Sequence, residues 1–479
     1  MKKTKIVATI GPASRSLEMV EKLADAGLDV ARLNFSHDVH AQHEISIDNI
    51  RKVSREKGRP LAIIQDLQGA RVRVGCLPKE GVKISKGELI VLTDEKNLDK
   101  VKVRGKKIIP ITYPGLTKTV KVGHELYIQD KLVELITRKA TTNYLICESK
   151  RDGVILEHKG INFPHSAVDL PTITEKDKRD IKFGIKKKVD YIALSFVRSA
   201  DDVKELRQLI KKYAGAGEAN NFKIIVKIER PEAIEHFDEI LAETDAIMIA
   251  RGDLGIELPP EDIPFIQKDL ITRCLKAAKP VITATHMLDS MINNLHPTRA
   301  EVSDVANAII DHTDAVMLSG ETATGKYPAE AVEMMNKIAQ KSEASALSEL
   351  DIRGKSEKAC CAKSVICTAI SGLTRKENVK AILAVSLSEQ IARMISRYRP
   401  NVPIFIAVDN VETERHLALS WGVFPFRVKH CENIEKLIDN SIKIIRKRKF
   451  IKKGEKIIVI ADRFFANSED INLVKVYKA

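Results

Sequence analysis

The feature that most restricts the fold of this chain is a repeated alternation of short apolar runs with segments of helical spacing. Three runs precede residue 68 and five follow residue 170, at residues 5–10, 29–37, 61–66, 191–197, 222–229, 246–250, 280–285 and 315–319. Eight strands that each lead into a helix are typical of a closed (β/α)8 barrel, where the chemistry gathers at the carboxyl ends of the strands. The sequence therefore predicts such a barrel from residues 1–68 and 170–344.

Residues 69–169 interrupt this alternation. Eight glycines between Gly75 and Gly160 separate short apolar runs such as 89–92, a spacing of turn signals that is typical of a small β-domain. After about residue 345 the pattern changes again, and the apolar runs 381–386, 403–408 and 457–461 alternate with helical patterns. The predicted fold class is α/β, with an inserted small β-barrel at 69–169 and a C-terminal α/β domain at 345–479 whose sheet is largely parallel.

Composition narrows the class of protein. With 44% apolar residues among 479, the chain can bury several cores. Lys and Arg exceed Asp and Glu by 79 − 65 = 14, which indicates either a polyanionic partner or small anionic substrates. The basic run at 446–453 ends a helical pattern, where cations suit the helix dipole, and aromatic residues are too few for base stacking. We therefore expect no nucleic-acid partner.

The cysteines and the apolar segments indicate a compartment. Seven cysteines form no C-x-x-C motif and leave an odd count, which favours reduced thiols. No apolar stretch reaches the ~18 residues that a membrane span needs. The expectation is a cytoplasmic protein without a membrane partner.

Polar side chains recur where the predicted strands end. Lys227 and Glu229 alternate onto one face of the strand 222–229. An isolated pair of this kind is usually a solvated ion pair, but other strands end in the same way. The remaining candidates are Arg32, Asn34, Ser36 and His37 on the second strand, Asp66 on the third with Arg71 and Arg73 beyond it, Gly252 and Asp253 after the sixth, Thr285 on the seventh and Ser319 on the eighth.

Glu229 and Asp253 follow neighbouring strands and make a hard oxygen site that suits Mg²⁺ or Mn²⁺. The alternative is that Asp253 only caps the helix that follows it. Lys227, Arg32 and Arg73 would place cations beside the metal, and phosphoryl transfer requires this combination of carboxylate-held metal and fixed positive charge. No Walker motif and no protein-kinase loop set is present.

Five motifs resemble the pyruvate kinase family. They are ARLNFSH at 31–37, IVKIE at 225–229, ARGDLG at 250–255, TATHML at 283–288 and LSGETA at 318–323. The resemblance extends over essentially the whole chain. It implies transfer of the phosphoryl group of phosphoenolpyruvate to ADP, which gives pyruvate and ATP, in a protein of a family that is usually homotetrameric.

The resemblance also implies roles for single residues. Glu229 and Asp253 would hold Mg²⁺, and Gly252 with Thr285 would meet the substrate carboxylate. Lys227 would stabilise charge on the phosphoryl group and the enolate, and Arg32 would bind phosphate. The nucleotide would contact Asn34, His37 and Arg73, a water near Thr285 and Ser319 would protonate the enolate, and residues 69–169 would close as a lid.

The chain also departs from the family pattern at the K⁺ site. The resemblance implies K⁺ ligands at Asn34, Ser36, Asp66 and the carbonyl of Leu67. Arg71 stands where many relatives have Glu, and its guanidinium could supply the charge that K⁺ brings. The sequence therefore predicts activity that is largely independent of K⁺.

Two further departures concern ligands. Ser199 stands where a nucleotide-side Lys is common. In the C-terminal domain, the expected phosphate loops at 386–390 and 462–467 lack their glycines, and Glu389 would repel a phosphate. Activation by a bisphosphorylated sugar at that pocket is therefore not expected.

Two other functions remain open from the residues alone. One is a different Mg²⁺-dependent barrel that acts on pyruvate, such as a lyase or carboligase. The other is a barrel without activity whose basic surface binds RNA.

Overall fold

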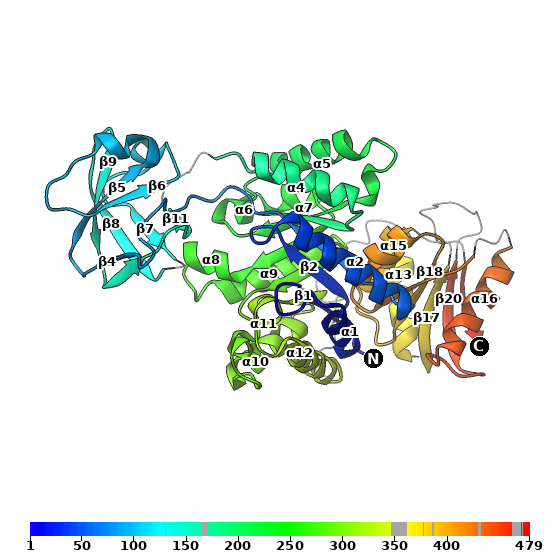
Figure 1. Ribbon diagram of the computed structural model, residues 1–479. Coiled ribbons are helices and arrows are strands. Elements are labelled where there is room, and N and C mark those ends of the chain that lie inside the picture. The colour runs from blue at the N-terminus through cyan, green and yellow to red at the C-terminus, as the bar shows by residue number, and fades with distance from the viewer. Residues whose placement is uncertain are drawn as a thin grey trace.

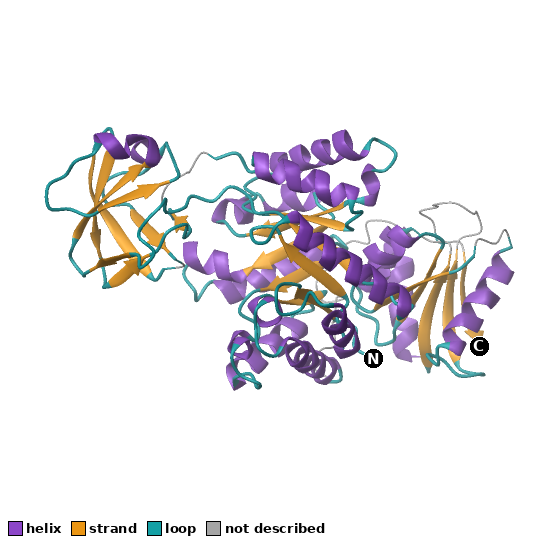
Figure 2. Cartoon of the chain, in the orientation of Figure 1, coloured by secondary structure: helices purple, strands orange, loops and turns teal. Residues whose placement is uncertain are grey.

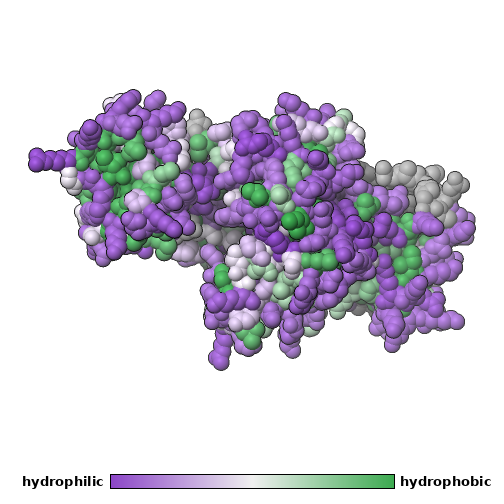
Figure 3. Space-filling model, in the orientation of Figure 1, coloured by the Kyte–Doolittle hydropathy of each residue, from purple (hydrophilic) through white to green (hydrophobic). Residues whose placement is uncertain are grey.

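The computed structural model describes residues 1–129, 131–164, 170–345, 362–376, 378–385, 388–429, 433–461, 471 and 473–479. Figure 1 shows three bodies in a row, with the inserted β-domain at one end, the barrel in the middle and the C-terminal sheet at the other end. Within the described residues, no helix combines the length and the apolar character needed to cross a bilayer. Figure 3 shows that hydrophilic side chains cover most of the face in view.

The central body is a closed barrel of eight parallel strands, as predicted. Around the barrel the order is β1-β16-β15-β14-β13-β12-β3-β2. The strands are β1 (Lys5–Thr9), β2 (Val30–Asn34), β3 (Ala62–Asp66), β12 (Tyr191–Leu194), β13 (Lys223–Ile228), β14 (Ala246–Ala250), β15 (Val281–Ala284) and β16 (Ala315–Leu318).

Each strand has apolar residues on both faces, which explains why the runs are nearly continuous in sequence. One set of side chains, among them Val7, Tyr191 and Met248, fills the barrel interior. The other set packs under the surrounding helices.

Helices surround the strands (Figure 2). They are α1 (Leu17–Ala26), α2 (His40–Glu56), α4 (Glu175–Lys186), α5 (Ala200–Ala214), α6 (Pro231–Glu235), α7 (Phe237–Glu243), α9 (Ile263–Lys276), α10 (Arg299–Ile310), α11 (Gly320–Ala323) and α12 (Pro328–Glu343). The predicted N-cap at Thr174 is confirmed, because Thr174 and Asp177 form a reciprocal capping box.

Helix α8 (Arg251–Glu257) begins directly after β14. Gly252 and Asp253, which were expected after the sixth strand, therefore lie in the first turn of this helix, so Asp253 is not the residue that caps it.

The inserted segment folds around its own apolar core. It contains β4 (Val82–Ile84), β5 (Leu89–Asp94), β6 (Ile108–Ile111), α3 (Leu116–Thr119), β7 (Glu125–Ile128), β8 (Val133–Ala140), β9 (Tyr144–Ser149), β10 (Gly153–Ile155) and β11 (Ile161–Asn162). Six strands form a sheet in the order β11-β7-β8-β9-β5-β6, and β10 pairs with β4. Arg73 bridges to Gly160 beside β11, and Val74 bridges to Ile111 of β6. Residues 73–74 therefore join the two edges of the sheet into a small barrel.

In the part of the C-terminal body that the structure describes, four α-helices accompany a five-stranded sheet. Its strand order is β19-β18-β17-β20-β21, with β17 (Val379–Val385), β18 (Ile404–Val408), β19 (Val423–Arg427), β20 (Lys456–Ala461) and β21 (Leu473–Lys478). The helices are α13 (Ala362–Lys376), α14 (Glu389–Ser396), α15 (Val411–His416) and α16 (Ile434–Lys447).

The sequence prediction missed β19 and β21 in this sheet. Both are edge strands. Pro425 interrupts the strand pattern of β19, which an edge strand tolerates, and β21 alternates apolar residues with lysines and pairs antiparallel to β20. The other strand pairs of the sheet are parallel.

The C-terminal body packs against the amino end of the barrel. Ala418 and Leu419 complete the apolar interior of the barrel at its amino end. The buried Tyr191 hydroxyl donates to the His416 carbonyl at 2.6 Å. The amino end is therefore closed, and only the carboxyl end of the strands is left for chemistry.

Candidate active site

Lys227 and Glu229 lie together at the carboxyl end of β13, on the face that the two-residue alternation predicted. Lys227 Nζ is 2.8 Å from Glu229 Oε1 and 3.4 Å from Asp66 Oδ1. It also donates to Ser195 Oγ at 2.9 Å. One ammonium thus meets two carboxylates and a hydroxyl in a largely buried position.

Arg32 and Asp66 form a second pair beside the first. Arg32 Nε donates to Asp66 Oδ2 at 2.6 Å, and Arg32 Nη1 donates to Thr9 Oγ1 at 2.9 Å. The Arg32 side chain is only 10% exposed, so its planar fork is held in one orientation. Asp66 therefore links the two cations that the sequence placed on different strands.

The charged groups in this cluster shift one another's pKa values. Burial opposes ionisation of Asp66, but Lys227 and Arg32 together lower the pKa of Asp66. Burial alone would lower the pKa of Lys227, yet Asp66 and Glu229 raise the pKa of Lys227 above its ordinary value. Lys227 is consequently a permanent cation.

Glu229 behaves in the opposite way. Burial, opposed by Lys227 and assisted by the charge of Asp253, raises the pKa of Glu229 to about 7. The Phe196 N–H donates to Glu229 Oε2 at 2.7 Å, whereas Oε1 makes no well-oriented hydrogen bond and has only the ion pair with Lys227. Glu229 Oε1 is therefore buried beside Lys227 without a well-oriented hydrogen bond, and the nearby charge of Asp253 disfavours its ionisation.

This environment fits a divalent cation. Glu229 and Asp253 offer hard oxygen ligands, and the under-coordinated oxygen and the mutual repulsion of the two carboxylates are both relieved by a bound Mg²⁺ or Mn²⁺. No third His, Cys or carboxylate joins them in a preformed cluster among the described residues, so substrate oxygens would complete the coordination.

Gly252 and Thr285 meet beside the carboxylates. The Gly252 N–H donates to Thr285 Oγ1 at 2.8 Å, and a Cβ on Gly252 would lie 3.2 Å from that oxygen. Thr285 has φ 68° and His286 has φ 54°, which is costly for a β-branched residue. Arg251 Nη2 holds the Thr285 carbonyl at 2.8 Å and is itself anchored to Asp304 at 2.7 Å. Arg251 therefore holds the strained turn at Thr285 and His286 in place.

Arg71 connects the site with the inserted domain. Arg71 Nη1 is 3.8 Å from Asp253 Oδ1, and Arg71 Nη2 donates to Asn162 Oδ1 at 3.1 Å. Asn162 donates in turn to Glu257 of α8 at 3.1 Å. Gly160 lies so close to the Arg71 guanidinium that a Cβ at this position would overlap it. Arg71 thus contacts both the inserted domain and the barrel, beside the candidate metal ligand Asp253.

Several predicted residues lie around the site without joining the Lys227 cluster in the described contacts. Asn34 Oδ1 accepts the Ser36 N–H at 3.0 Å, and the Leu67 carbonyl accepts the Ser195 hydroxyl at 2.7 Å. His37 is exposed on the loop after β2. The Ser319 N–H donates to Glu321 at 2.7 Å at the end of β16.

Arg73 lies in the inserted domain, where its guanidinium donates to the His158 carbonyl at 3.0 Å. Burial and Arg71 lower the pKa of Arg73. A cavity of about 320 Å³ separates the two domains here, and Gly69, Arg71, Arg73, Thr112 and Pro171 are among the residues that line it.

Sequence reasoning missed three residues of the site. Thr9 ends β1 and accepts from Arg32, Ser195 follows β12 and contacts Lys227, and Phe196 at φ 57° points its N–H at Glu229. Thr9 and Ser195 follow the rule that located the other residues, namely a polar side chain at the end of an apolar run. The φ of Phe196 has no signal in the sequence.

Glu389 was expected to repel a phosphate, and its contacts contradict that expectation. Glu389 faces the barrel, where it pairs with His416 Nδ1 at 2.8 Å, Arg393 at 3.2 Å and Lys223 at 3.4 Å. Despite burial, His416 and Arg393 lower the pKa of Glu389 to about 2. Its charge is neutralised in the interface, so it does not supply the expected repulsion of a phosphate. Residues 386–387 and 462–467 of the predicted effector loops lie outside the described residues.

Two other sequence interpretations concern helices. Ser199 is the N-cap of α5, in a capping box with Asp202. The basic run at 446–453 lies at the end of α16, where exposed Lys and Arg side chains border an open groove. The groove is lined by residues of the C-terminal body and does not belong to the barrel mouth.

Known proteins resemble this chain over its whole length. Residues 1–332 match the family "Pyruvate kinase, barrel domain", and residues 364–477 match "Pyruvate kinase, alpha/beta domain". A protein named pyruvate kinase from Sporosarcina psychrophila is 42% identical over 486 residues, which cover 100% of this chain and 80% of the relative. Proteins with the same name from Staphylococcus saprophyticus and Geobacillus stearothermophilus are 42% and 40% identical and are also covered to 80%.

Proposed function

Because this chain belongs to the pyruvate kinase family, we propose that it transfers the phosphoryl group of phosphoenolpyruvate to ADP and yields pyruvate and ATP. The observation that carries the proposal is the buried cluster in which Lys227 contacts Glu229, Asp66 and Ser195. Phosphoryl transfer needs fixed charges around the transferred group more than it needs covalent chemistry, and this cluster provides them.

The transfer breaks the bond between phosphorus and the enol oxygen and forms a bond to a terminal oxygen of ADP. Lys227 and Arg32 are positioned to stabilise the negative charge that spreads over these oxygens, because Asp66 fixes both side chains. Glu229 and Asp253 would hold Mg²⁺ or Mn²⁺, which supplies further positive charge when bound. Gly252 and Thr285 would bind the substrate carboxylate, and the hydrogen bond between them supports this role because it brings both groups to one point of the mouth.

The enolate that remains must take a proton to become pyruvate. Thr285 stands at the mouth with its hydroxyl donating to the Ala284 carbonyl at 2.6 Å, and we assign it, with Ser319, to the positioning of the water that delivers this proton. The inserted domain would exclude bulk water, and Asn34, His37 and Arg73 would contact the nucleotide.

A coupled assay for pyruvate tests the function. With phosphoenolpyruvate, ADP and Mg²⁺ we expect steady formation of pyruvate and an equal amount of ATP. Chelation of the metal should abolish both, and Mg²⁺ or Mn²⁺ should restore both. Pyruvate without a requirement for ADP would instead favour a lyase, and no turnover together with tight RNA binding would favour a binding protein.

We also propose that the activity is largely independent of K⁺. Arg71 brings a permanent positive charge to 3.8 Å from Asp253, and its position is set by Asn162 and Gly160. A cation that is built into the chain removes the need for a dissociable one. With Na⁺ or tetramethylammonium as the only monovalent cation, kcat should fall by less than about tenfold, or ~1.4 kcal/mol of barrier.

Two variants sharpen this prediction. Arg71→Glu should lose most of its activity in Na⁺ and regain part of it in K⁺, whereas Arg71→Lys should stay insensitive to the cation. A larger than tenfold K⁺ stimulation of the unmodified protein would contradict the proposal, and so would an Arg71→Glu variant that shows no new response to K⁺.

A further inference from the structure

Cys76, Glu157 and His158 converge on the surface of the inserted domain. One ligand atom from each residue lies within 4.8 Å of the ligand atoms of the other two. His158 Nε2 and Glu157 Oε2 are 3.8 Å apart, and both side chains are open to solvent, with 62% and 43% exposure. Cys76 is an exposed free thiol. We propose that these three residues form a Zn²⁺ site.

Backbone hydrogen bonds hold the two segments that carry the ligands side by side. Cys76 follows closely after residues 73–74, which close the small barrel, and Glu157 and His158 lie on the segment that is hydrogen-bonded to Val74. The His158 N–H donates to the Val74 carbonyl, and the Val74 N–H donates to the Lys159 carbonyl, both at 2.9 Å. His158 has φ 60°, a left-handed conformation that directs the chain back at this point. The three ligand atoms therefore lie within 4.8 Å of one another on two paired segments.

The donor set selects the metal. A thiolate and an imidazole prefer Zn²⁺ over the hard cations Mg²⁺ and Ca²⁺, and a carboxylate is a common third ligand. Three protein ligands leave one position of a tetrahedral Zn²⁺ for water. The pair Glu229 and Asp253 has only oxygen donors, so the two sites differ in the ion that they favour.

The site lies beside a residue of the proposed nucleotide pocket. The Arg73 guanidinium donates to the carbonyl of His158. An ion bound to the His158 ring would therefore fix the position of His158 and, through this hydrogen bond, that of Arg73. Zn²⁺ would tie the closing segment of the small barrel to its neighbour at this position. The proposal rests on the lid geometry alone and does not depend on the proposed phosphoryl transfer.

Cobalt provides a direct test because Co²⁺ bound to a thiolate gives a charge-transfer absorption band that oxygen sites lack. We titrate the full chain with Co²⁺ in excess Mg²⁺, which fills the oxygen site. One equivalent should produce the band, and Zn²⁺ should displace it. Cys76→Ser should abolish the band, and His158→Gln should weaken Co²⁺ binding at least about tenfold.

A matched control is available on the barrel. His236 Nδ1 lies 4.0 Å from Glu239, but this pair belongs to no three-ligand group in the described part of the chain. His236→Gln should leave the band unchanged. Should a variant fail to fold, protection of Cys76 from alkylation by Zn²⁺ in the unmodified protein decides the question. Absence of the band, its survival in Cys76→Ser, or alkylation of Cys76 that Zn²⁺ does not slow would each overturn the proposal.

Discussion

Replacing Lys227 with Met is expected to lower kcat by about 10³-fold or more, or ~4 kcal/mol of barrier. Lys227 is the one largely buried cation that contacts both Glu229 and Asp66 in the described cluster. Methionine has a similar length and no charge, so the variant removes the stabilisation of the enolate and the phosphoryl oxygens without opening a large cavity. Assays at saturating phosphoenolpyruvate and ADP measure the effect.

The fold should survive this change. Arg32 still neutralises Asp66, and Glu229 can take up a proton, because the loss of Lys227 raises the pKa of Glu229 further above about 7. Thermal unfolding of the variant should therefore remain cooperative. Lys212→Met, at an exposed position in the last turn of α5, is the matched control and should keep full activity. A Lys227→Met variant that is folded and retains more than a tenth of the activity would refute the assigned role.

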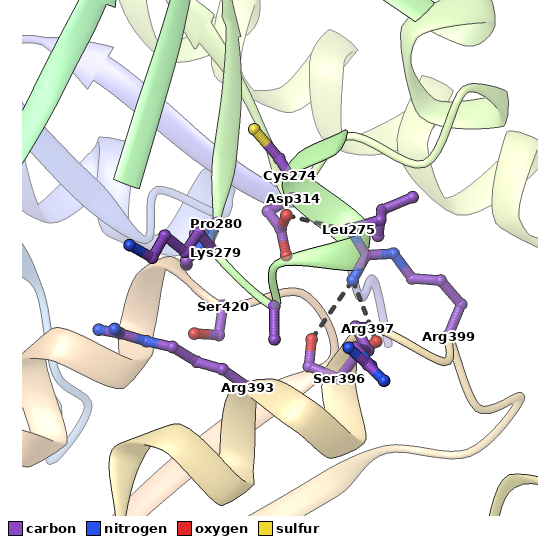
Figure 4. A pocket seen from close by; sticks show the side chains of 11 residues that line it. Cys274, Leu275, Lys279, Pro280, Asp314, Arg393, Ser396, Arg397, Arg399 and Ser420 are labelled. Atoms are coloured by element: carbon purple, nitrogen blue, oxygen red, sulfur yellow. Dashed lines mark hydrogen bonds and ion pairs between the residues drawn. The ribbon is translucent and has the colours of Figure 1, made fainter. Parts of the chain in front are cut away.

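Replacing Arg399 with Met is expected to destabilise the junction of the barrel and the C-terminal body by ~3–5 kcal/mol. Arg399 Nη2 pairs with Asp314 at 3.1 Å, and the two side chains are only 2% and 7% exposed. Arg399 also donates to the carbonyls of Ser396 and His312. Figure 4 shows Arg399 between Asp314 and Ser396. Without the guanidinium, Asp314 stays buried without a counterion.

Trp421 reports on this junction. It is the only tryptophan of the chain, its backbone N–H donates to Asp314 at 3.1 Å, and its ring lies 5.0 Å from the Arg399 guanidinium. Urea unfolding followed by tryptophan fluorescence therefore measures the local loss of stability. Arg446→Met, at an exposed position near the end of α16, should change the midpoint little. If Arg399→Met changes the free energy of unfolding by less than about 1 kcal/mol, the ion pair contributes little to stability and the prediction is wrong.

Much of the barrel was predictable because its signals are local. Apolar runs that are buried on both faces and alternate with helical spacing identify parallel strands. The two-residue period places Lys227 and Glu229 on one face, and polar residues at the strand ends located Arg32, Asp66 and Asp253. The same rule would have found Thr9 and Ser195, had the first and fourth strands been treated in the same way.

The edge strands β19 and β21 were harder to predict for different reasons, because β19 is mostly buried but contains a proline, whereas β21 is largely exposed. Pro425 gives the sequence of β19 the character of a loop, and the alternating lysines give β21 the character of an exposed segment. Neither residue type excludes an edge position, where one side of the backbone needs no partner strand.

By itself, the sequence determined the eight-stranded barrel, the inserted and C-terminal bodies, and the carboxylates and cations that gather at the strand ends. Only the tertiary structure decided that Glu389 faces the barrel, that residues 73–74 close the inserted domain and that Cys76 meets Glu157 and His158. The physical reason is that these contacts join residues far apart in the sequence. Periodicity reports the burial of neighbouring residues along one element, whereas a contact between distant segments depends on how whole elements pack, and that information is spread over the entire chain.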